Sequence, residues 1–487
     1  MVNLKLIYKI IGLLLMIEAV FMATCVFMAI YFRSCDTWPF VISLAITIGA
    51  GLGLLRLGHD APNMMTRRDS YIVVTLTWIT FSIFGSLPYL FSGIIGNPTD
   101  AFFETMSGFT TTGASVLTDV EAELYEHHAM LFWRSLSQWV GGLGIVFFTI
   151  AILPSMVGGS MRVFSAEATG PIRSKMHPRL STNAKWIWTV YLALTIGCVA
   201  SYALAGMDWF SALNYGMTTT ATGGFSIHND SIAHFHSPAI EYIGLFFQFL
   251  SGVNFTVLYM VVIKRQFKAF YKNSEIRFYT ILVVGCSLWI TIILMSQSGY
   301  SLWNAIRSAT FHVVSLMTTT GIFCDHVGAW PHLTWIILSI LMFIGACAGS
   351  TSGGFKSVRA LMILKVIQNE FKRLLHPRAV LPVKINGHAM PSSTVQNLLA
   401  FFAIYILACL GTTTLMLAIN IDITNSVVIS LSCINNVGLP LNELGPDMTW
   451  NSMPIIIKWF CSLLMLMGRL EIFNVLILLT PSYWKDN

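Results

Sequence analysis

The sequence predicts an all-α polytopic membrane protein. Of its 487 residues, 55% are hydrophobic and only 10% are charged, whereas soluble domains carry roughly 25% charged residues. The apolar stretches are long and unbroken, unlike the ~10-residue alternating strands of a membrane barrel. Because a helical span needs about 20 apolar residues, the chain has room for roughly ten crossings.

Ten apolar stretches are predicted to cross the membrane, so both termini lie on the same side. They cover residues 4–32, 38–58, 71–91, 129–153, 184–206, 238–263, 277–297, 332–365, 394–419 and 453–479. The first stretch resembles a signal peptide, but its apolar run continues to Ala29 with no clear cleavage site. We therefore interpret it as a retained first helix.

Most of the 28 Lys and Arg residues fall in loops on one side of these spans. They cluster at Arg56–Arg68, Arg162–Lys185, Lys264–Arg277 and Lys356–Lys384. By the positive-inside rule this side is cytoplasmic, and it holds both termini. A nucleic-acid surface is excluded, because its charge would form one patch rather than four loops on one side of a membrane.

Four outer connections share a short apolar segment followed by a polar string that contains glycine. They read DAFFETMSGFTTTGAS from Asp100, DWFSALNYGMTTTATGGFS from Asp208, LWNAIRSATFHVVSLMTTTGIF from Leu302 and ITNSVVISLSCINNVGLP from Ile423. The glycines Gly113, Gly223, Gly321 and Gly438 recur at intervals of roughly 100 residues, which indicates an internal repeat. Each unit is predicted to hold a span, a re-entrant segment and a second span.

An apolar segment of about ten residues is too short to cross a bilayer, so it is expected to enter as a half-helix and stop. The polar string then returns as extended backbone, which is tolerated at membrane depth only where protein or a water-filled cavity surrounds it. Four such returns around one axis would line a pore with carbonyl oxygens, the ligands that replace a cation's water. Glycine allows the positive φ that this backbone requires.

The repeat divides the chain into five segments. Residues 1–66 form two additional N-terminal helices, expected outside the pore. The four repeats are 67–160, 161–272, 273–385 and 386–487, each with a first helix (M1), a pore helix and a second helix (M2). The predicted arrangement is pseudo-fourfold around one pore.

Several motifs resemble those of a known family. The strings TTTGAS, TATGGFS, TTTGIF and NNVGLP are similar to the four filter loops of the Trk/Ktr/HKT potassium transporter superfamily. Four further motifs are similar to bacterial TrkH/TrkG-type uptake subunits: QWVGGLGIV from Gln138, GACAGSTSGGFK from Gly345, LLHPRAV from Leu374 and MGRLEI from Met467. The resemblance covers essentially the whole chain.

The resemblance implies potassium uptake across a bacterial inner membrane, driven by the membrane potential, with coupling to protons or sodium left open. The implied potassium-binding filter residues are Thr111, Thr112 and Gly113; Ala221, Thr222 and Gly223; Thr319, Thr320 and Gly321; and Asn436, Val437 and Gly438. The sequence departs from the family after the third and fourth glycines, at Ile322 and Leu439. Potassium is the only ligand implied, with no organic cofactor in this chain.

The stretch 332–365 is too long for one span and is interrupted by a glycine-rich run, which makes a poor helix interior. The resemblance implies an intramembrane gate below the filter, formed by Gly345, Gly349, Ser350, Thr351, Ser352, Gly353 and Gly354. The alternative is a packing kink between close helices. Arg469 lies in the last span, where a cation is costly without a cavity or partner. The resemblance places it beneath the filter; the alternative is a structural pair with Glu471.

The resemblance also implies a homodimer and a cytoplasmic nucleotide-binding regulatory ring of the TrkA type. The basic loops are otherwise interpreted as topology determinants and contacts to membrane lipid.

The alternative function is a membrane-embedded enzyme, which would need acid, base or metal ligands clustered at one depth. The spans offer little besides Glu18, Arg469 and Glu471. Glu104 and Arg307 are expected to anchor half-helices to their neighbours.

A histidine group lies in an outer loop at His228, His234 and His236, with no cysteine or carboxylate spacing to complete a metal site. We interpret these histidines as solvated.

Overall fold

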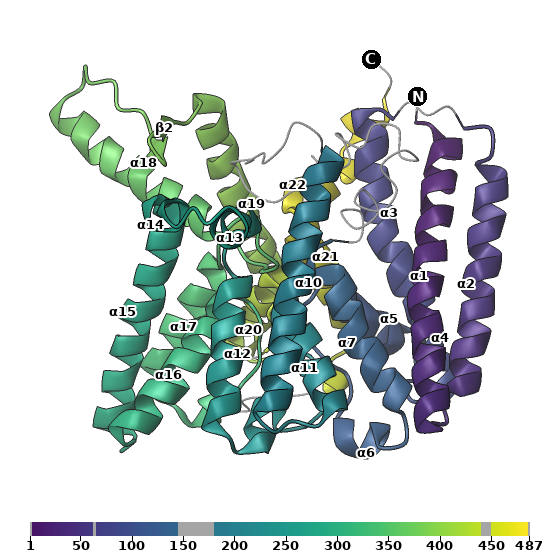
Figure 1. Cartoon of the computed structure of the whole chain (residues 1–487). Helices are drawn as coiled ribbons and strands as arrows, with labels where there is room; N and C mark the ends of the chain where they lie inside the picture. The colour runs from purple at the N-terminus through teal and green to yellow at the C-terminus, as the bar shows by residue number, and fades with distance from the viewer. Residues whose placement is uncertain (1, 62–64, 145–179, 440–449, 486–487) are drawn as a thin grey trace.

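The computed structural model describes residues 2–61, 65–144, 180–439 and 450–485, and its regular structure is almost entirely helical (Figure 1). Long helices run between two ends of the molecule, and short helices lie between them. The long helices that begin the chain are α1 (Leu4–Phe32), α2 (Thr37–Leu57) and α3 (Arg67–Gly85), which continues into α4 (Leu87–Ser92). Further long helices are α10 (Leu180–Leu204), α15 (Ser274–Gln297) and α19 (Ser392–Ala418).

Two further apolar helices are sharply bent. The pair α12 (Pro238–Ser251) and α13 (Phe255–Val262) meets at 106°, and α21 (Ile455–Leu470) meets the segment that starts with α22 (Ile472–Leu476) at 117°. The first bend is capped by Asn254, whose side chain accepts hydrogen bonds from the backbone N–H groups that begin α13. The described residues thus contain six helices long and apolar enough to cross a membrane, or eight if each bent pair is one span.

The expected number of ten spans is not reached in the described residues, for two reasons. The stretch 129–153 appears as α7 (His128–Gly142), and the rest of that span and most of the Arg162–Lys185 cluster lie outside the described residues. The stretch 332–365 is interrupted: α17 (His332–Ile344) ends in a loop, and α18 (Ser357–Leu375) is exposed over its C-terminal half. The interruption itself agrees with the glycine-rich run that the sequence contains.

Four short helices follow long ones and end near the centre of the molecule: α5 (Pro98–Phe109), α11 (Trp209–Ala221), α16 (Leu302–Met317) and α20 (Ile423–Asn435). Three begin at a side-chain cap, from Asn97, Asp208 and Asp422. Their C-terminal residues are buried. These are the half-helices that the apolar segments predict.

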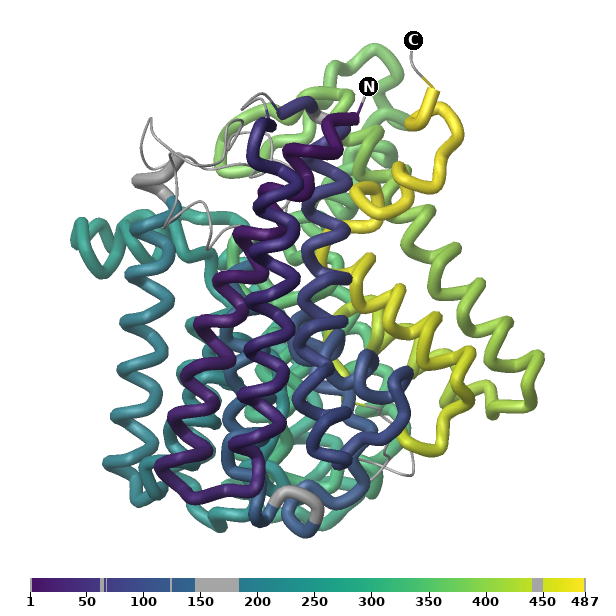
Figure 2. Tube along the Cα trace, turned by 90° about the vertical axis from the view of Figure 1, so that its right-hand side faces the viewer, coloured from purple at the N-terminus to yellow at the C-terminus, as the bar shows by residue number. Residues whose placement is uncertain are grey.

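The first two helices lie beside one another along one side of the molecule (Figure 2). Helix α1 also packs against α3 and α7. Glu18 of α1 is fully buried where α1 meets α3, close to Gly85. It therefore lies at a contact between helices.

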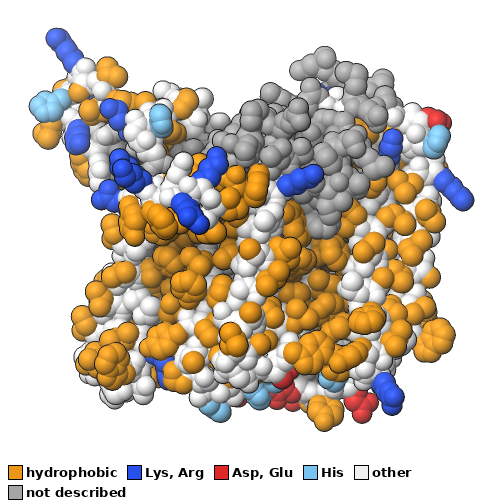
Figure 3. Space-filling view, viewed as in Figure 1, with side chains coloured by type: hydrophobic (Ala, Val, Ile, Leu, Met, Phe, Trp, Pro, Cys, Tyr) orange, Lys and Arg blue, Asp and Glu red, His pale blue; other side chains and the backbone are white. Residues whose placement is uncertain are grey.

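Charged side chains separate between the two ends of the molecule (Figure 3). Lys and Arg gather at the end that holds both termini, α14 (Lys268–Lys272), α18 and the hairpin of β1 (Lys384–Ile385) and β2 (His388–Ala389). The view shows acidic and histidine side chains at the opposite end, near α6 (Val120–Leu124). The remaining short elements are η1 (Ser231–Phe235), η2 (Val327–Ala329), η4 (Trp450–Ser452), η5 (Ile477–Leu479) and α23 (Pro481–Trp484).

Candidate functional site

Each half-helix is followed by the same sequence of backbone conformations. One residue adopts the left-handed conformation, with φ of 55° at Thr111, 53° at Thr222, 56° at Thr319 and 56° at Asn436. Two residues later in each string comes a glycine with positive φ, namely Gly113 (83°), Gly224 (84°), Gly321 (76°) and Gly438 (75°). We call these four segments strings one to four; they cover residues 111–113, 222–224, 319–321 and 436–438.

The strings contact one another in a closed ring. A Cβ at Gly113 would overlap the carbonyl oxygen of Gly223 in the next string. The same overlap would occur between Gly224 and Thr320, between Gly321 and Val437, and between Gly438 and Thr112. The four carbonyl oxygens of Thr112, Gly223, Thr320 and Val437 therefore occupy equivalent positions, each against the glycine of the preceding string. Only glycine permits this approach at that position.

String two differs by one residue from the assignment made on sequence. The expected triplet was Ala221, Thr222 and Gly223, but the equivalent residues in the structure are Thr222, Gly223 and Gly224. Ala221 is the last residue of α11 instead. The string contains two consecutive glycines, and alignment on the first of them places every residue one position early.

Gln138 of α7 explains the glycine at the second position of string two. Its amide nitrogen donates to the Gly223 carbonyl oxygen at 2.7 Å, and its amide oxygen accepts from the Phe225 N–H at 3.1 Å. A Cβ at Gly223 would overlap the Gln138 amide. The glutamine thus fills the volume that a threonine side chain occupies in strings one and three. It also hydrogen-bonds a carbonyl oxygen within string two and the N–H group of the residue that follows the string. Gln138 belongs to the motif QWVGGLGIV, but the spacing did not reveal this role.

Buried polar groups also join string four to string one. The Asn436 amide donates to the Thr112 hydroxyl at 3.0 Å and to the Met465 carbonyl oxygen at 2.8 Å. At the start of string one, the hydroxyls of Thr110 and Thr112 are 2.8 Å apart. At the start of string three, the hydroxyls of Thr318 and Thr320 are also 2.8 Å apart. These contacts between uncharged groups hold strings one, three and four in place.

A cavity of about 330 Å³ opens on the outer side of the ring, and all four positive-φ glycines line it. Arg134 also lines this cavity, where its guanidinium pairs with Glu104 of α5 at 3.0 Å and donates to the Ser226 carbonyl oxygen at 2.9 Å. Glu104 therefore anchors its half-helix, as expected. Arg307 likewise anchors its half-helix α16, through an ion pair with Glu241 of α12 at 3.2 Å.

The glycine-rich segment between α17 and α18 lies on the inner side of the ring. We call residues 345–356 the intramembrane loop. The Gly353 N–H donates to the Thr319 hydroxyl at 2.7 Å, and the Thr351 hydroxyl donates to the Thr220 carbonyl oxygen at 3.1 Å. A Cβ at Gly353 would overlap the Asn435 carbonyl oxygen. The loop therefore contacts strings or half-helices from three of the four repeats.

The other side of the loop docks into the break between α12 and α13. The Cys347 N–H donates to the Gly252 carbonyl oxygen at 3.0 Å, and the Phe255 N–H donates to that of Gly349 at 2.9 Å. The Asn254 side-chain amide donates to the Ala348 carbonyl oxygen at 2.6 Å. The break and the loop thus satisfy each other's backbone groups, which a membrane interior requires. Gly345, Gly349 and Gly354 have positive φ, and the Ser350 hydroxyl bonds back to Cys347.

Arg469 of α21 connects the loop to α7. Its guanidinium donates to the Thr351 carbonyl oxygen at 2.8 Å, to that of Gly141 at 2.6 Å and to that of Gly142. Glu471 pairs with Arg359 of α18 at 2.6 Å. The arginine thus reaches toward the intramembrane loop, as the resemblance implied. Lys356, which the sequence analysis counts among the basic residues of a cytoplasmic loop, is instead buried in the intramembrane loop, and its ammonium donates to the Ser352 carbonyl oxygen.

The chain is similar over nearly its whole length to known cation transport proteins. The family model TrkH, described as a cation transport protein, matches residues 39–485. The Trk system potassium uptake protein TrkH of Halomonas elongata is 36% identical, over 99% of this chain and 100% of that protein. The TrkG protein of Escherichia coli K12 is 30% identical, over 98% and 97% respectively. The crystal structure of the potassium transporter TrkH from Vibrio parahaemolyticus matches with a TM-score of 0.89 at 34% identity, covering 99% of each chain.

The role of Gln138 gives a stability prediction. The substitution Gln138→Leu leaves the Gly223 carbonyl and the Phe225 N–H without their partner, so we expect the free energy of unfolding to fall by about 1–3 kcal/mol. Thermal unfolding of the purified protein in detergent measures this change.

A second buried glutamine is the matched control. Gln248 of α12 has no hydrogen-bond partner for its side-chain amide among the described residues, so Gln248→Leu should leave the stability unchanged or higher. An equal loss in both variants would contradict the bracing role of Gln138.

Proposed function

Because the chain belongs to the TrkH family of cation transport proteins, we propose that it takes up potassium through a pore lined by backbone carbonyl oxygens. The chain is a multi-pass membrane protein, and its family is one of transporters rather than enzymes. The alternative of a membrane-embedded enzyme is therefore excluded. The proposed location is the inner membrane of a bacterial cell, with both termini in the cytoplasm.

The observation that carries this proposal is the closed ring of four strings. A hard cation that loses its water needs several oxygen ligands at once, and backbone carbonyls supply them without fixed charge. The proposed potassium-binding residues are Thr111, Thr112 and Gly113; Thr222, Gly223 and Gly224; Thr319, Thr320 and Gly321; and Asn436, Val437 and Gly438. The half-helices point their C-termini toward the ring, and the negative ends of their dipoles favour a cation there.

We also propose that the four repeats are arranged with pseudo-fourfold symmetry around this pore. The equivalent backbone conformations of the strings and the cyclic order of their contacts support this arrangement. The segment boundaries 67–160, 161–272, 273–385 and 386–487 follow from it, and residues 1–66 lie outside. Ten crossings remain the expected number for the whole chain.

The intramembrane loop and Arg469 are the proposed gate on the inner side. The contacts of the loop with Thr220, Thr319 and Asn435 support a closed state, because they join the loop to one string and two half-helices, from three repeats, on the inner side of the ring. Arg469 adds a positive charge on the same side, which would repel an ion that leaves the filter. Opening then requires the loop to exchange these hydrogen bonds for others.

The membrane potential is the proposed driving force. One elementary charge that crosses 100 mV gains about 2.3 kcal/mol, enough to concentrate potassium by a factor of tens. The proposed assembly is a homodimer that binds a cytoplasmic TrkA-type ring, and the exposed basic side chains of α14 and α18 support a partner or lipid surface at that end. No organic cofactor is proposed for this chain.

The test of the proposal is growth of a bacterial strain without potassium uptake systems at limiting potassium. The unmutated chain, supplied with its regulatory partner, should restore growth. Gly113→Ser should abolish this rescue or lose discrimination against sodium, because a Cβ would overlap the Gly223 carbonyl and φ is 83°.

The control is Gly93→Ser at the end of α4. Gly93 has a similar φ of 76°, but a Cβ there meets nothing within 4 Å, so the backbone strain is matched while the ring is intact. Growth should be retained. No rescue by the unmutated, correctly inserted protein would contradict the proposed function.

The gate gives a second transport prediction. In liposomes without the regulatory partner, Arg469→Gln should raise the rubidium leak about tenfold, because hydrogen bonds to a charged group contribute about 1.5–3 kcal/mol and each 1.4 kcal/mol is a factor of ten. Arg373→Gln on the exposed face of α18 is the control. A variant with a shortened 345–354 segment should leak as well, and unchanged flux in both the Arg469 and the shortened variants would contradict the gate assignment.

A further inference from the structure

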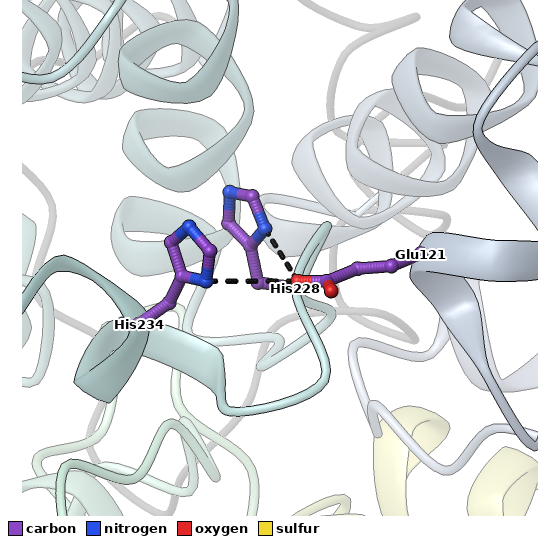
Figure 4. A group of neighbouring side chains, drawn as sticks. All are labelled: Glu121, His228 and His234. Carbon is purple, nitrogen blue, oxygen red and sulfur yellow. Dashed lines mark hydrogen bonds and ion pairs between the residues drawn. The ribbon is translucent and has the colours of Figure 1, made fainter.

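Three outer side chains from two repeats meet beside the mouth of the ring (Figure 4). Glu121 comes from α6, after string one, and His228 and His234 come from the loop after string two. A carboxylate oxygen of Glu121 lies 2.7 Å from the His228 Nδ1 and 3.6 Å from the His234 Nδ1. The two imidazole rings are stacked, 3.6 Å apart and 3° from parallel. Both nitrogens thus face the same oxygen.

This set matches the preferences of a divalent transition metal. Two imidazole nitrogens and one carboxylate, with a fourth position open to water, form a common zinc ligand set. One ligand atom from each residue lies within 4.8 Å of the others, while the ligands of a tetrahedral zinc ion are about 3.3 Å apart at bond lengths of 2.0–2.1 Å. Glu121 and His234 have side chains 44% and 43% exposed, so the required shift meets little packing resistance.

The loops that carry the ligands are already held together. Asp119, the N-cap of α6, accepts from the Ala122 N–H at 3.0 Å and from the Asn229 amide at 2.7 Å. The Asn229 amide oxygen accepts from the Val120 N–H at 2.9 Å. These bonds join the residues next to Glu121 to the residue next to His228, which preorganises these two ligands.

His228 is further fixed on its other side. The ring of Tyr215 lies nearly parallel to the His228 ring, and the Ser226 hydroxyl bonds both the His228 backbone and the Tyr215 hydroxyl. Burial lowers the pKa of His228 below its ordinary value, against the opposing effect of Glu121.

The position of His228 connects the cluster to the ion path. It lines the outer cavity that also holds the ring glycines, and it lines a neighbouring pocket of about 780 Å³ together with Glu121 and His234. Ser226, two residues before His228, accepts a hydrogen bond from Arg134 within the outer cavity. A bound metal would thus crosslink the loops of repeats one and two beside the outer cavity.

We propose that Glu121, His228 and His234 form an outer-face binding site for a divalent transition metal of the zinc class, and that occupancy of this site slows cation entry. The binding part of this inference stands on the side-chain cluster alone. The inhibitory part rests on the proposed transport function. The proposal replaces the solvated-loop interpretation for His228 and His234, because Glu121 supplies the carboxylate that the local spacing lacks, while His236 stays outside the cluster.

Metal binding is tested on the full chain purified in detergent. Titration with Zn²⁺ by calorimetry should give one site per chain, and Co²⁺ should produce the intense visible absorption of tetrahedral coordination. His228→Gln, His234→Gln and Glu121→Gln should each weaken binding about tenfold or more. Glu121→Gln keeps a hydrogen-bond acceptor for the histidines, so it separates the loss of a metal ligand from a loss of structure.

His236→Gln is the matched control, because His236 lies in the same loop and outside the cluster. Its variant should bind Zn²⁺ like the unmutated chain. Absence of a site, or a site that survives all three ligand substitutions, would overturn the proposal.

The effect on transport is measured as rubidium uptake into liposomes with Zn²⁺ on the outer side. Zn²⁺ should lower uptake several-fold for the unmutated chain and for the His236→Gln variant, and a chelator should restore it. Uptake by the His234→Gln variant should not respond to Zn²⁺. Binding without inhibition would overturn the inhibitory part. Absence of uptake in metal-free vesicles would instead contradict the proposed function, while the calorimetric titration still decides whether the site exists.

Discussion

The close approach of four backbone strings, with no Cβ between neighbours, is the constraint on which the rest of the structure depends. An unpartnered carbonyl in a dry membrane interior costs several kcal/mol, so extended backbone at this depth needs either partners or an ion path. Glycine at Gly113, Gly224, Gly321 and Gly438 permits the approach. The half-helices, the brace from Gln138 and the pair of Arg134 with Glu104 all hold the strings in place from outside the ring.

The inner side of the ring follows the same rule. The broken helix of α12 and α13 exposes backbone groups that an intact helix would satisfy internally, and the intramembrane loop supplies their partners. Arg469 caps carbonyl oxygens at the end of α7 and on the loop at once. Irregular backbone therefore occurs in the centre of this molecule because each irregular segment completes the hydrogen bonding of another.

Much of this architecture could be predicted from the sequence, because it depends on local patterns. Apolar length predicted the long helices, and the polar glycine strings predicted the half-helices and their extended continuations. The register of string two could not be predicted in this way. It depends on Gln138, which lies 85 residues before Gly223 in the chain. The partner of Glu471 is Arg359, again far away in sequence, and Glu121 joins two histidines more than 100 residues further on. Periodicity and spacing report on neighbours along the chain, and these contacts exist only after the repeats have packed.

The four strings carry different side chains at the same level of the ring. At its second position, strings one and three carry the hydroxyl side chains of Thr112 and Thr320, whereas strings two and four carry Gly223 and Val437. Because the contacts run in the order one, two, three, four, the two hydroxyls stand diagonally opposite each other. At this level the side-chain hydroxyls thus lie on one diagonal of the ring, and the other diagonal carries none. A single polypeptide with four different strings can adjust one diagonal without the other, a freedom that an assembly of four identical subunits lacks.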